Sequence, residues 1–231
     1  THECSSAASD VYKRQANNGY SAAHVLDARR IDFWNLTAEN NGASPSATVE
    51  EQAGLYYFES NNVESASGDV RCRNCSISGS TGQGLLAVNS VDLWLEGLHL
   101  EDNNPTMPAF EVDNGDTMPG GASGRVQVTN AHVEAETPGQ PAVKFHRAAV
   151  EVNGLTMAGN HSGLEWRGDN NGQFPSYLNN SVLSGTQCVL LEGHPSLNGH
   201  GNRISSACTG SITFTDSQVN WSGLIDDRAG S

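Results

Sequence analysis

The chain has 231 residues, of which 12 are basic and 26 acidic, so its formal net charge is −14. Binding to phosphate requires concentrated Lys and Arg, and this balance therefore argues against nucleic acid as a partner and against an anionic membrane surface. No apolar run approaches the roughly 18 residues that a membrane-spanning helix needs. We expect no membrane-spanning segment in this part of the protein.

The first residues, Thr1–Gln15, differ from everything that follows. They lack the repeat described below, and they lack the apolar central stretch of a signal peptide. We expect residues 1–15 to be a leader or an appended segment, and residues 16–231 to be one repetitive domain.

One six-residue pattern recurs along the rest of the chain: apolar, any, Asn/Gly/Asp, small or apolar, any, apolar. Its seven copies begin at Phe33, Cys72, Leu95, Val128, Val152, Leu178 and Phe214. Alternation with a period of two indicates strands with one buried face. The central Asn, Gly or Asp tolerates left-handed backbone angles, so each copy is predicted to bend from one strand into another.

A second kind of strand-like segment alternates with these hexads. Examples are Leu55–Tyr57, Phe110–Val112 and Val143–Phe145. A self-similar unit of about 20–35 residues without helical periodicity is typical of a β-solenoid, in which short strands pair with those of the turns above and below. The sequence therefore predicts an all-β solenoid of about seven turns.

One connection in each turn keeps its length, whereas the other varies. Variable connections in a solenoid emerge at one corner and stack along one edge. The predicted insertions on this edge are Glu59–Asp69, Asp113–Gly124, Arg167–Ser176 and Gly193–Ser211, and a separate insertion, Asn40–Gln52, follows the first hexad. Because no capping element follows the last hexad, we expect a slice of a longer solenoid.

The five cysteines suggest structural roles. Cys72 and Cys75 form a CxxC, but they occupy hexad positions that face inward, so we interpret them as core residues or as a disulfide. Cys188 and Cys208 flank the longest predicted insertion and could pair to tie its base to the solenoid, with free thiols as the equal alternative. Cys4 lies in the leader segment.

Catalytic and metal-binding patterns are weak. Gly199-His-Gly201 and Asp226-Asp227 are pieces of polygalacturonase active sites, but their order is reversed here. A glycosidase needs two carboxylates about 5–9.5 Å apart, and no such pair can be placed. His99 and His132 fall at outward positions and are interpreted as solvated. We expect no cofactor and assign no catalytic or metal-binding residue.

The C-terminal half resembles a known family. Leu178-Asn-Asn-Ser-Val-Leu-Ser-Gly185 and the run from Ser211 to Asn220-Trp-Ser-Gly223 are similar to the repeats of pertactin-like autotransporter passenger domains. The resemblance implies a right-handed parallel β-helix, truncated here before its C-terminal cap and membrane barrel. It also implies a bacterial protein that is displayed on the outer membrane or secreted.

These expectations favour adhesion or self-association through the stacked loops. The partner would be a protein or glycan on a host cell or a neighbouring bacterium, contacted at many weak points. Two alternatives remain: a β-helical carbohydrate-active enzyme or phage tailspike-like polysaccharide binder, and a structural stalk. Enzymatic activity is less favoured than adhesion, since fold alone does not establish it.

Overall fold

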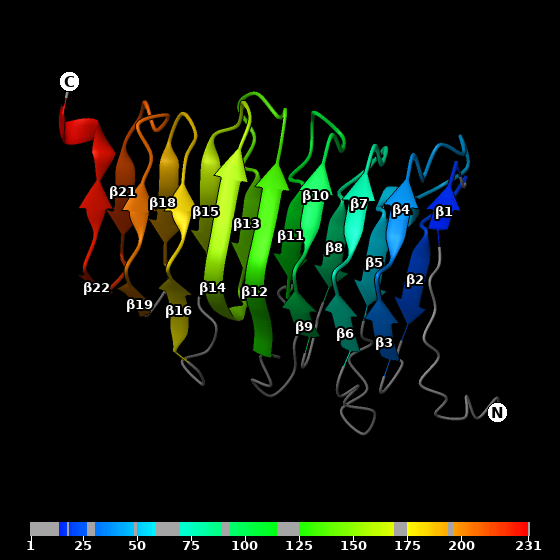
Figure 1. Ribbon diagram of the computed structural model, residues 1–231, viewed down its shortest axis with the longest axis horizontal. Helices are drawn as coiled ribbons and strands as arrows, with labels where there is room; N and C mark the ends of the chain where they lie inside the picture. The colour runs from blue at the N-terminus through cyan, green and yellow to red at the C-terminus, as the bar shows by residue number, and fades with distance from the viewer. Residues whose placement is uncertain are drawn as a thin grey trace.

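The protein is a parallel β-solenoid of about six turns with little helix (Figure 1). Its computed structural model describes residues 14–17, 19–26, 31–48, 50–58, 70–88, 93–114, 125–168, 175–193 and 196–230. All strand pairs are parallel, and successive coils lie side by side along one long axis (Figure 1). The predicted fold class is confirmed, with about six turns in place of about seven.

Two sheets wrap the core, with fifteen strands in sheet A and eight in sheet B. Sheet A contains β1 (Arg14–Ala16), β3 (Ile31–Trp34), β4 (Thr37–Glu39), β6 (Val70–Arg73), β7 (Ser76–Ser78), β9 (Leu93–Glu96), β10 (His99–Glu101), β12 (Arg125–Glu134), β14 (Ala149–Ala158), β16 (Ser176–Asn179), β17 (Val182–Leu183), β19 (Leu197–His200), β20 (Arg203–Ile204), β22 (Val219–Ser222) and β23 (Ile225–Asp226). Sheet B contains β2 (Ala23–Leu26), β5 (Leu55–Phe58), β8 (Leu85–Val88), β11 (Phe110–Asp113), β13 (Val143–His146), β15 (Gly163–Arg167), β18 (Cys188–Glu192) and β21 (Ile212–Thr215). Two 3-10 helices, η1 (Glu50–Gln52) and η3 (Asp227–Gly230), complete the described elements.

The hexads form sheet A in register. Cys72 pairs with Leu95, Leu95 with Val128, and Val128 with Val152, so equivalent inward residues stack directly on one another. All four side chains are buried. Sheet B contributes a matching stack of aromatic rings, in which edge-to-face contacts join Phe110 to Phe145 and Phe145 to Trp166. The shared core of the coils is therefore built from repeated columns of like side chains.

The bend in each hexad uses a left-handed residue, as its sequence predicts. Asn74 and Asn130 have φ values of 52° and 53°, and Gly97 and Gly154 occupy the equivalent place in the following coils. A Cβ on Gly97 would lie 2.7 Å from Oδ1 of Asn74, and one on Gly154 would lie 2.9 Å from Oδ1 of Asn130. Asparagine thus fills the space that the next coil leaves open by using glycine.

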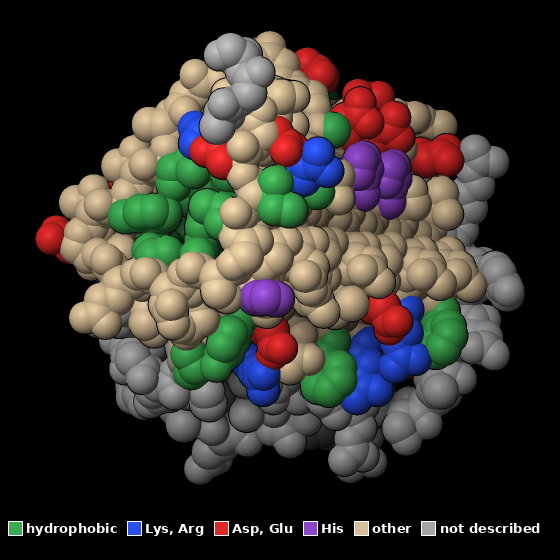
Figure 2. Space-filling model, turned by 60° about the vertical axis from the view of Figure 1, so that its left-hand side comes forward, with side chains coloured by type: hydrophobic (Ala, Val, Ile, Leu, Met, Phe, Trp, Pro, Cys, Tyr) green, Lys and Arg blue, Asp and Glu red, His purple; other side chains and the backbone are tan. Residues whose placement is uncertain are grey.

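The seventh predicted hexad is wrong. Phe214 lies on β21 of sheet B, whereas Val219 lies on β22 of sheet A, so the two residues do not share one bent strand. Phe214 is 43% exposed, because β21 is the edge strand of sheet B in the described part of the chain. Hydrophobic side chains accordingly gather at this end of the solenoid (Figure 2).

The predicted insertion Gly193–Ser211 is also wrong, because it contains a complete part of a coil. β19 pairs with β16 and β20 pairs with β17, so this segment continues sheet A. The sequence pattern missed it because Gly199 stands where the other hexads have an apolar residue. A Cβ on Gly199 would lie 2.6 Å from Nε1 of Trp221, whose indole from the next coil takes that space.

Most of the other predicted insertions lie outside the described residues, namely residues 59–69, 115–124 and 169–174. By connectivity, all three link a strand of sheet B to the next strand of sheet A. The insertion Asn40–Gln52 links sheet A to sheet B instead. Within it, Thr48 N donates to Glu51 Oε2 at 2.9 Å and Glu51 N donates to Thr48 Oγ1, a capping box that starts η1.

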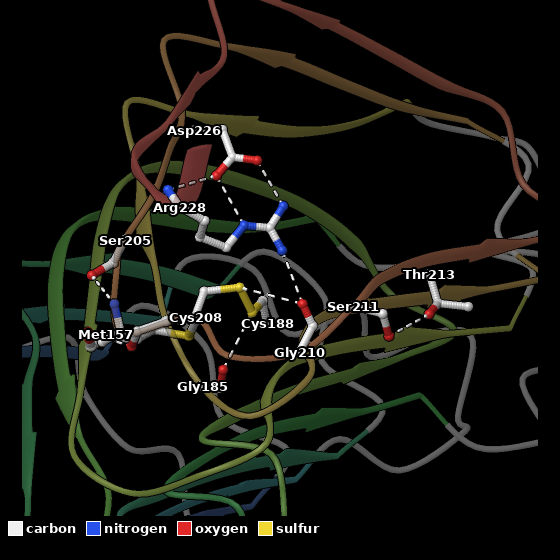
Figure 3. Close-up of a disulfide and its surroundings, with 12 residues drawn as sticks. Met157, Gly185, Cys188, Ser205, Cys208, Gly210, Ser211, Thr213, Asp226 and Arg228 are labelled. Carbon is white, nitrogen blue, oxygen red and sulfur yellow. Dashed lines mark hydrogen bonds and ion pairs between the residues drawn. A yellow bond between two sulfur atoms is a disulfide. The ribbon is translucent and has the colours of Figure 1, made fainter. Parts of the chain in front are cut away.

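Two disulfides tie the described coils. Cys72 and Cys75 are bonded across the bend at Asn74, with their Cα atoms 5.9 Å apart and both side chains fully buried. Cys188 on β18 is bonded to Cys208, just before β21, across a Cα–Cα distance of 5.5 Å (Figure 3). Residues 1–13 of the leader, Cys4 among them, lie outside the described residues. Its last two residues, Arg14 and Gln15, belong to β1 and pair with β4.

Candidate binding face

The outer surface of sheet A carries the strongest candidate site. Alternation along β3, β6, β9 and β12 sends every second side chain out of the core, and the parallel register stacks these side chains in two columns. One column runs through Asp32, Arg71, Trp94 and Gln127, and the other runs through Trp34, Arg73, Glu96 and Thr129. Figure 2 shows basic, acidic and hydrophobic side chains side by side along the solenoid surface.

Two arginines lie on the faces of two exposed tryptophans. The Arg73 guanidinium is 4.6 Å from the ring centroid of Trp34, and the Arg71 guanidinium is 4.7 Å from that of Trp94. The indoles remain 38% and 40% exposed. A cation–π contact at such a site contributes about 0.5–1 kcal/mol, which holds both side chains in a defined orientation.

A shallow depression of about 320 Å³ opens between these side chains. It is lined by Arg71, Arg73, Trp94, Leu95, Glu96, Gln127 and Thr129. We call these residues, together with Trp34, the Trp–Arg groove. Arg73 Nε lies 3.8 Å from Glu96 Oε2, and Asp32 pairs with Arg71 in register, so each arginine has an acidic neighbour in an adjacent coil.

The same two columns continue toward the C-terminus, where uncharged polar side chains predominate. We call the Asn and Tyr side chains of this continuation the amide strip: Asn153, Tyr177, Asn179, Asn198 and Asn220. The same columns also pass through Glu151, His200 and Ser222. Asn180 at the neighbouring bend donates through Nδ2 to Asn153 Oδ1 at 2.9 Å, and Asn179 Oδ1 accepts from His200 N at 3.0 Å. Glu151, the one acidic residue in these columns beyond the groove, is ion-paired with Arg125.

The outward histidines lie beyond the bend on sheet A. His99 and His132 stack with centroids 5.1 Å apart and planes inclined by 8°. Each approaches a glutamate two residues along its own strand: His99 Nε2 is 3.3 Å from Glu101 Oε2, and His132 Nε2 is 3.9 Å from Glu134 Oε2. Within the described residues no group of three or more His, Cys, Asp or Glu is arranged to hold a metal ion.

Sheet B carries an ion-pair network on its outer surface. Lys144 Nζ lies 2.6 Å from Glu111 Oε1, and Gln83 Nε2 donates to Glu111 Oε2 at 2.8 Å. Burial alone would lower the pKa of Lys144, but its hydrogen bond and attraction to Glu111 outweigh burial and raise it. His146 Nδ1 contacts Asp113 Oδ1 at 2.9 Å. These carboxylates are therefore engaged with cations or imidazole.

The paired aspartates near the C-terminus are engaged too. Arg228 donates from Nη2 to Asp226 Oδ2 at 2.7 Å and from Nη1 to the Gly210 carbonyl at 2.9 Å (Figure 3). Hydrogen bonds from Arg228 lower the pKa of Asp226 to about 2. Asp227 pairs with Arg203. A carboxyl that stays ionised in this way is poorly suited to act as a general acid.

Among the described histidines, His161 is buried in the fold. It is 1% exposed, its Nε2 lies 3.4 Å from Ser184 Oγ, and burial lowers its pKa below the usual value. It lies in the corner between β14 and β15 and is not among the residues that line the Trp–Arg groove, which favours a structural role.

The Trp–Arg groove was not identified from the sequence. The available signal was that Trp34 and Trp94 occupy positions which alternation points outward, where a large aromatic residue has no packing reason to be. The spacing alone did not reveal that the coil between the two tryptophans places Arg73 on the ring of Trp34 and Arg71 on the ring of Trp94. The four cysteines singled out from the sequence are all buried in the core and do not line this groove: Cys72, Cys75, Cys188 and Cys208.

None of the helices in the described part of the chain has the length and apolar character needed to cross a membrane. When the chain is compared with protein-family models, with curated proteins and with solved structures, nothing matches.

Proposed function

We propose that this chain is the β-solenoid part of a bacterial surface or secreted protein of the pertactin-like passenger type, and that it mediates adhesion or self-association. Support comes from the parallel β-solenoid and from the sequence resemblance of Leu178–Gly185 and Ser211–Gly223. The observation that carries the proposal is the Trp–Arg groove, because exposed tryptophans stacked with arginines have no role in holding the core.

The shape of the binding face suits attachment to another surface. The two columns of this face run through eight strands of sheet A, from β3 to β22, which at a spacing of about 4.8 Å extend about 34 Å along the axis. Trp and Arg are the residues most enriched among those that dominate binding energy. Weak contacts spread along such a face combine into firm attachment when many copies are displayed together.

The proposal is tested by coating beads with the purified chain and measuring their attachment to host epithelial cells and to one another. We expect attachment or clumping by the unaltered chain and its loss on Trp34→Ala combined with Trp94→Ala. Tyr20→Ala is the matched control, since Tyr20 is 45% exposed but lies outside the groove. Attachment that is equal for the unaltered and the doubly substituted chain would refute the role of this face.

A further inference from the structure

The chemistry of the binding face points to a particular class of ligand. We propose that the Trp–Arg groove and the amide strip together bind an extended, uncharged polysaccharide chain that lies along the solenoid axis. This inference rests on the proposed function and names the ligand of the same face.

The tryptophans supply apolar platforms. Trp34 and Trp94 lie on β3 and β9 with β6 between them, so they are two coils, or about 10 Å, apart along the axis. With an arginine on one face of each ring, 38% of Trp34 and 40% of Trp94 stay exposed. The carbon-bound hydrogens of a pyranose ring pack against this remaining indole surface, which removes apolar surface from water. Because Arg73 and Arg71 already hold the indoles in place, little side-chain freedom is lost on binding.

The polar side chains match hydroxyl groups. Each sugar hydroxyl both donates and accepts hydrogen bonds, and so does each side-chain amide. Gln127 and Thr129 line the groove, and Asn153, Asn179 and Asn198 continue the same two columns beyond it. A linear polysaccharide repeats its hydroxyls along one direction, as the stacked coils repeat these side chains.

The charge of the face favours a neutral chain over an acidic one. Arg73 faces Glu96, Arg71 is the register neighbour of Asp32, and Arg125 pairs with Glu151. The groove and strip therefore present no excess of positive charge. The net charge of −14 on the whole chain repels polyanions before they reach the surface.

The size of the face favours a glycan over a folded protein. The two columns are separated by two residues along each strand, or about 7 Å, and the depression holds about 320 Å³. A stable protein interface buries about 800 Å² on each partner over 20–30 residues. A strip two side chains wide is the footprint of a single extended polymer chain.

The test uses the purified 231-residue chain and affinity electrophoresis through gels that contain a soluble β-glucan, starch, a galactomannan or polygalacturonate. We expect retardation by at least one of the three neutral polymers, unchanged between low and high salt. Trp94→Ala should weaken that interaction about tenfold, which corresponds to the loss of one good aromatic contact. Gln127→Ala provides a second, less disruptive variant that should also weaken it, and Tyr20→Ala should leave it unchanged.

Several results would overturn the inference. These are retardation by none of the neutral polymers, retardation by polygalacturonate alone with loss at high salt, or full binding by both Trp94→Ala and Gln127→Ala. Mobility changes caused by dimerisation through the face, detected by light scattering, would assign it to a second copy instead. Attachment to cells that depends on Trp94 in a chain that binds no neutral polymer would leave adhesion standing and reject the ligand class. Polymer binding without attachment to cells would do the opposite.

Discussion

Gly199 lies beneath the indole of Trp221, where a Cβ on the glycine would come within 2.6 Å of Nε1. The two residues are register partners on β19 and β22. The lack of a side chain at Gly199 thus leaves the space that the indole of Trp221 in the next coil occupies. This exchange also hid the β19–β20 coil from the hexad pattern.

Gly199→Ala should therefore destabilise the protein by about 1–3 kcal/mol, the usual cost of forcing extra volume into a packed site. Thermal or urea unfolding would measure the change. In a Trp221→Ala background the same substitution should cost much less, because the space is then free. An equal penalty in both backgrounds would show that the indole is not the obstacle.

The bend column yields a prediction about backbone conformation. Asn130 has a φ of 53°, so Asn130→Ala should cost about 1–2 kcal/mol through left-handed strain. Asn130→Gly should cost less, since glycine adopts this conformation freely. Urea unfolding of the two variants side by side distinguishes strain from lost side-chain contacts, which both substitutions remove. If glycine proves as costly as alanine, the side chain and not the backbone sets the requirement.

The disulfide between Cys188 and Cys208 should stabilise the C-terminal coils. Its residues are 20 apart in sequence, against 3 for Cys72 and Cys75. Loop-closure entropy then gives about 3 kcal/mol for the longer loop and about 2 kcal/mol for the shorter. Because the longer loop gains more freedom in the unfolded chain, replacing Cys188 and Cys208 with serine should lower the unfolding free energy more than replacing Cys72 and Cys75 does. Reducing agent should have little further effect on a chain that carries all four substitutions. Unfolding midpoints measured with and without reductant test both statements.

His161 should make the fold sensitive to mild acid. Burial lowers its pKa in the folded state below the ordinary value of 6.5. Between these two pKa values the unfolded chain binds a proton that the folded chain does not, so stability falls as the pH drops through 6.5 and levels off below the folded pKa. Above pH 6.5 the residue is neutral in both states and has no effect.

The groups near His161 modify this behaviour but do not reverse it. Ser184 Oγ lies 3.4 Å from Nε2, while the Ala158 backbone and Glu136 favour the protonated form less strongly than burial opposes it. Urea unfolding at a series of pH values should show the decline in the unaltered chain and a flatter profile in His161→Asn. His132→Asn, at a half-exposed position on sheet A, is the control and should leave the decline intact.

Much of the fold was predictable because the repeat has a physical cause. Inward positions such as Val128 and Val152 must be apolar in every coil, and the bend must use Asn or Gly, so both features recur in the sequence. Phe214 misled the assignment because an apolar residue before an Asp-Ser bend satisfies the same pattern in a different part of the coil. A six-residue window does not distinguish a bend within sheet A from the corner between the sheets.

The candidate site was less predictable, for a related reason. Outward positions are free to vary, so Trp34, Arg71, Arg73 and Trp94 form no recurring pattern along the chain. Their relationship exists only between coils, in the pairing of Arg73 with Trp34 and of Arg71 with Trp94. Separations of 39 and 23 residues carry no periodic signal until the number of residues in each turn is known.

The parallel register of the coils affects how the sequence of such a protein can evolve. An outward side chain on sheet A meets mainly the equivalent residues of the coils before and after it, as Gln127 meets Trp94 and Glu151. Substituting it alters one short stretch of the surface and leaves the shared core untouched. Inserting or deleting a whole coil would lengthen or shorten the binding face by one strand spacing and would preserve the register of the coils on either side. The length of the face and the side chains displayed on it can therefore diversify independently.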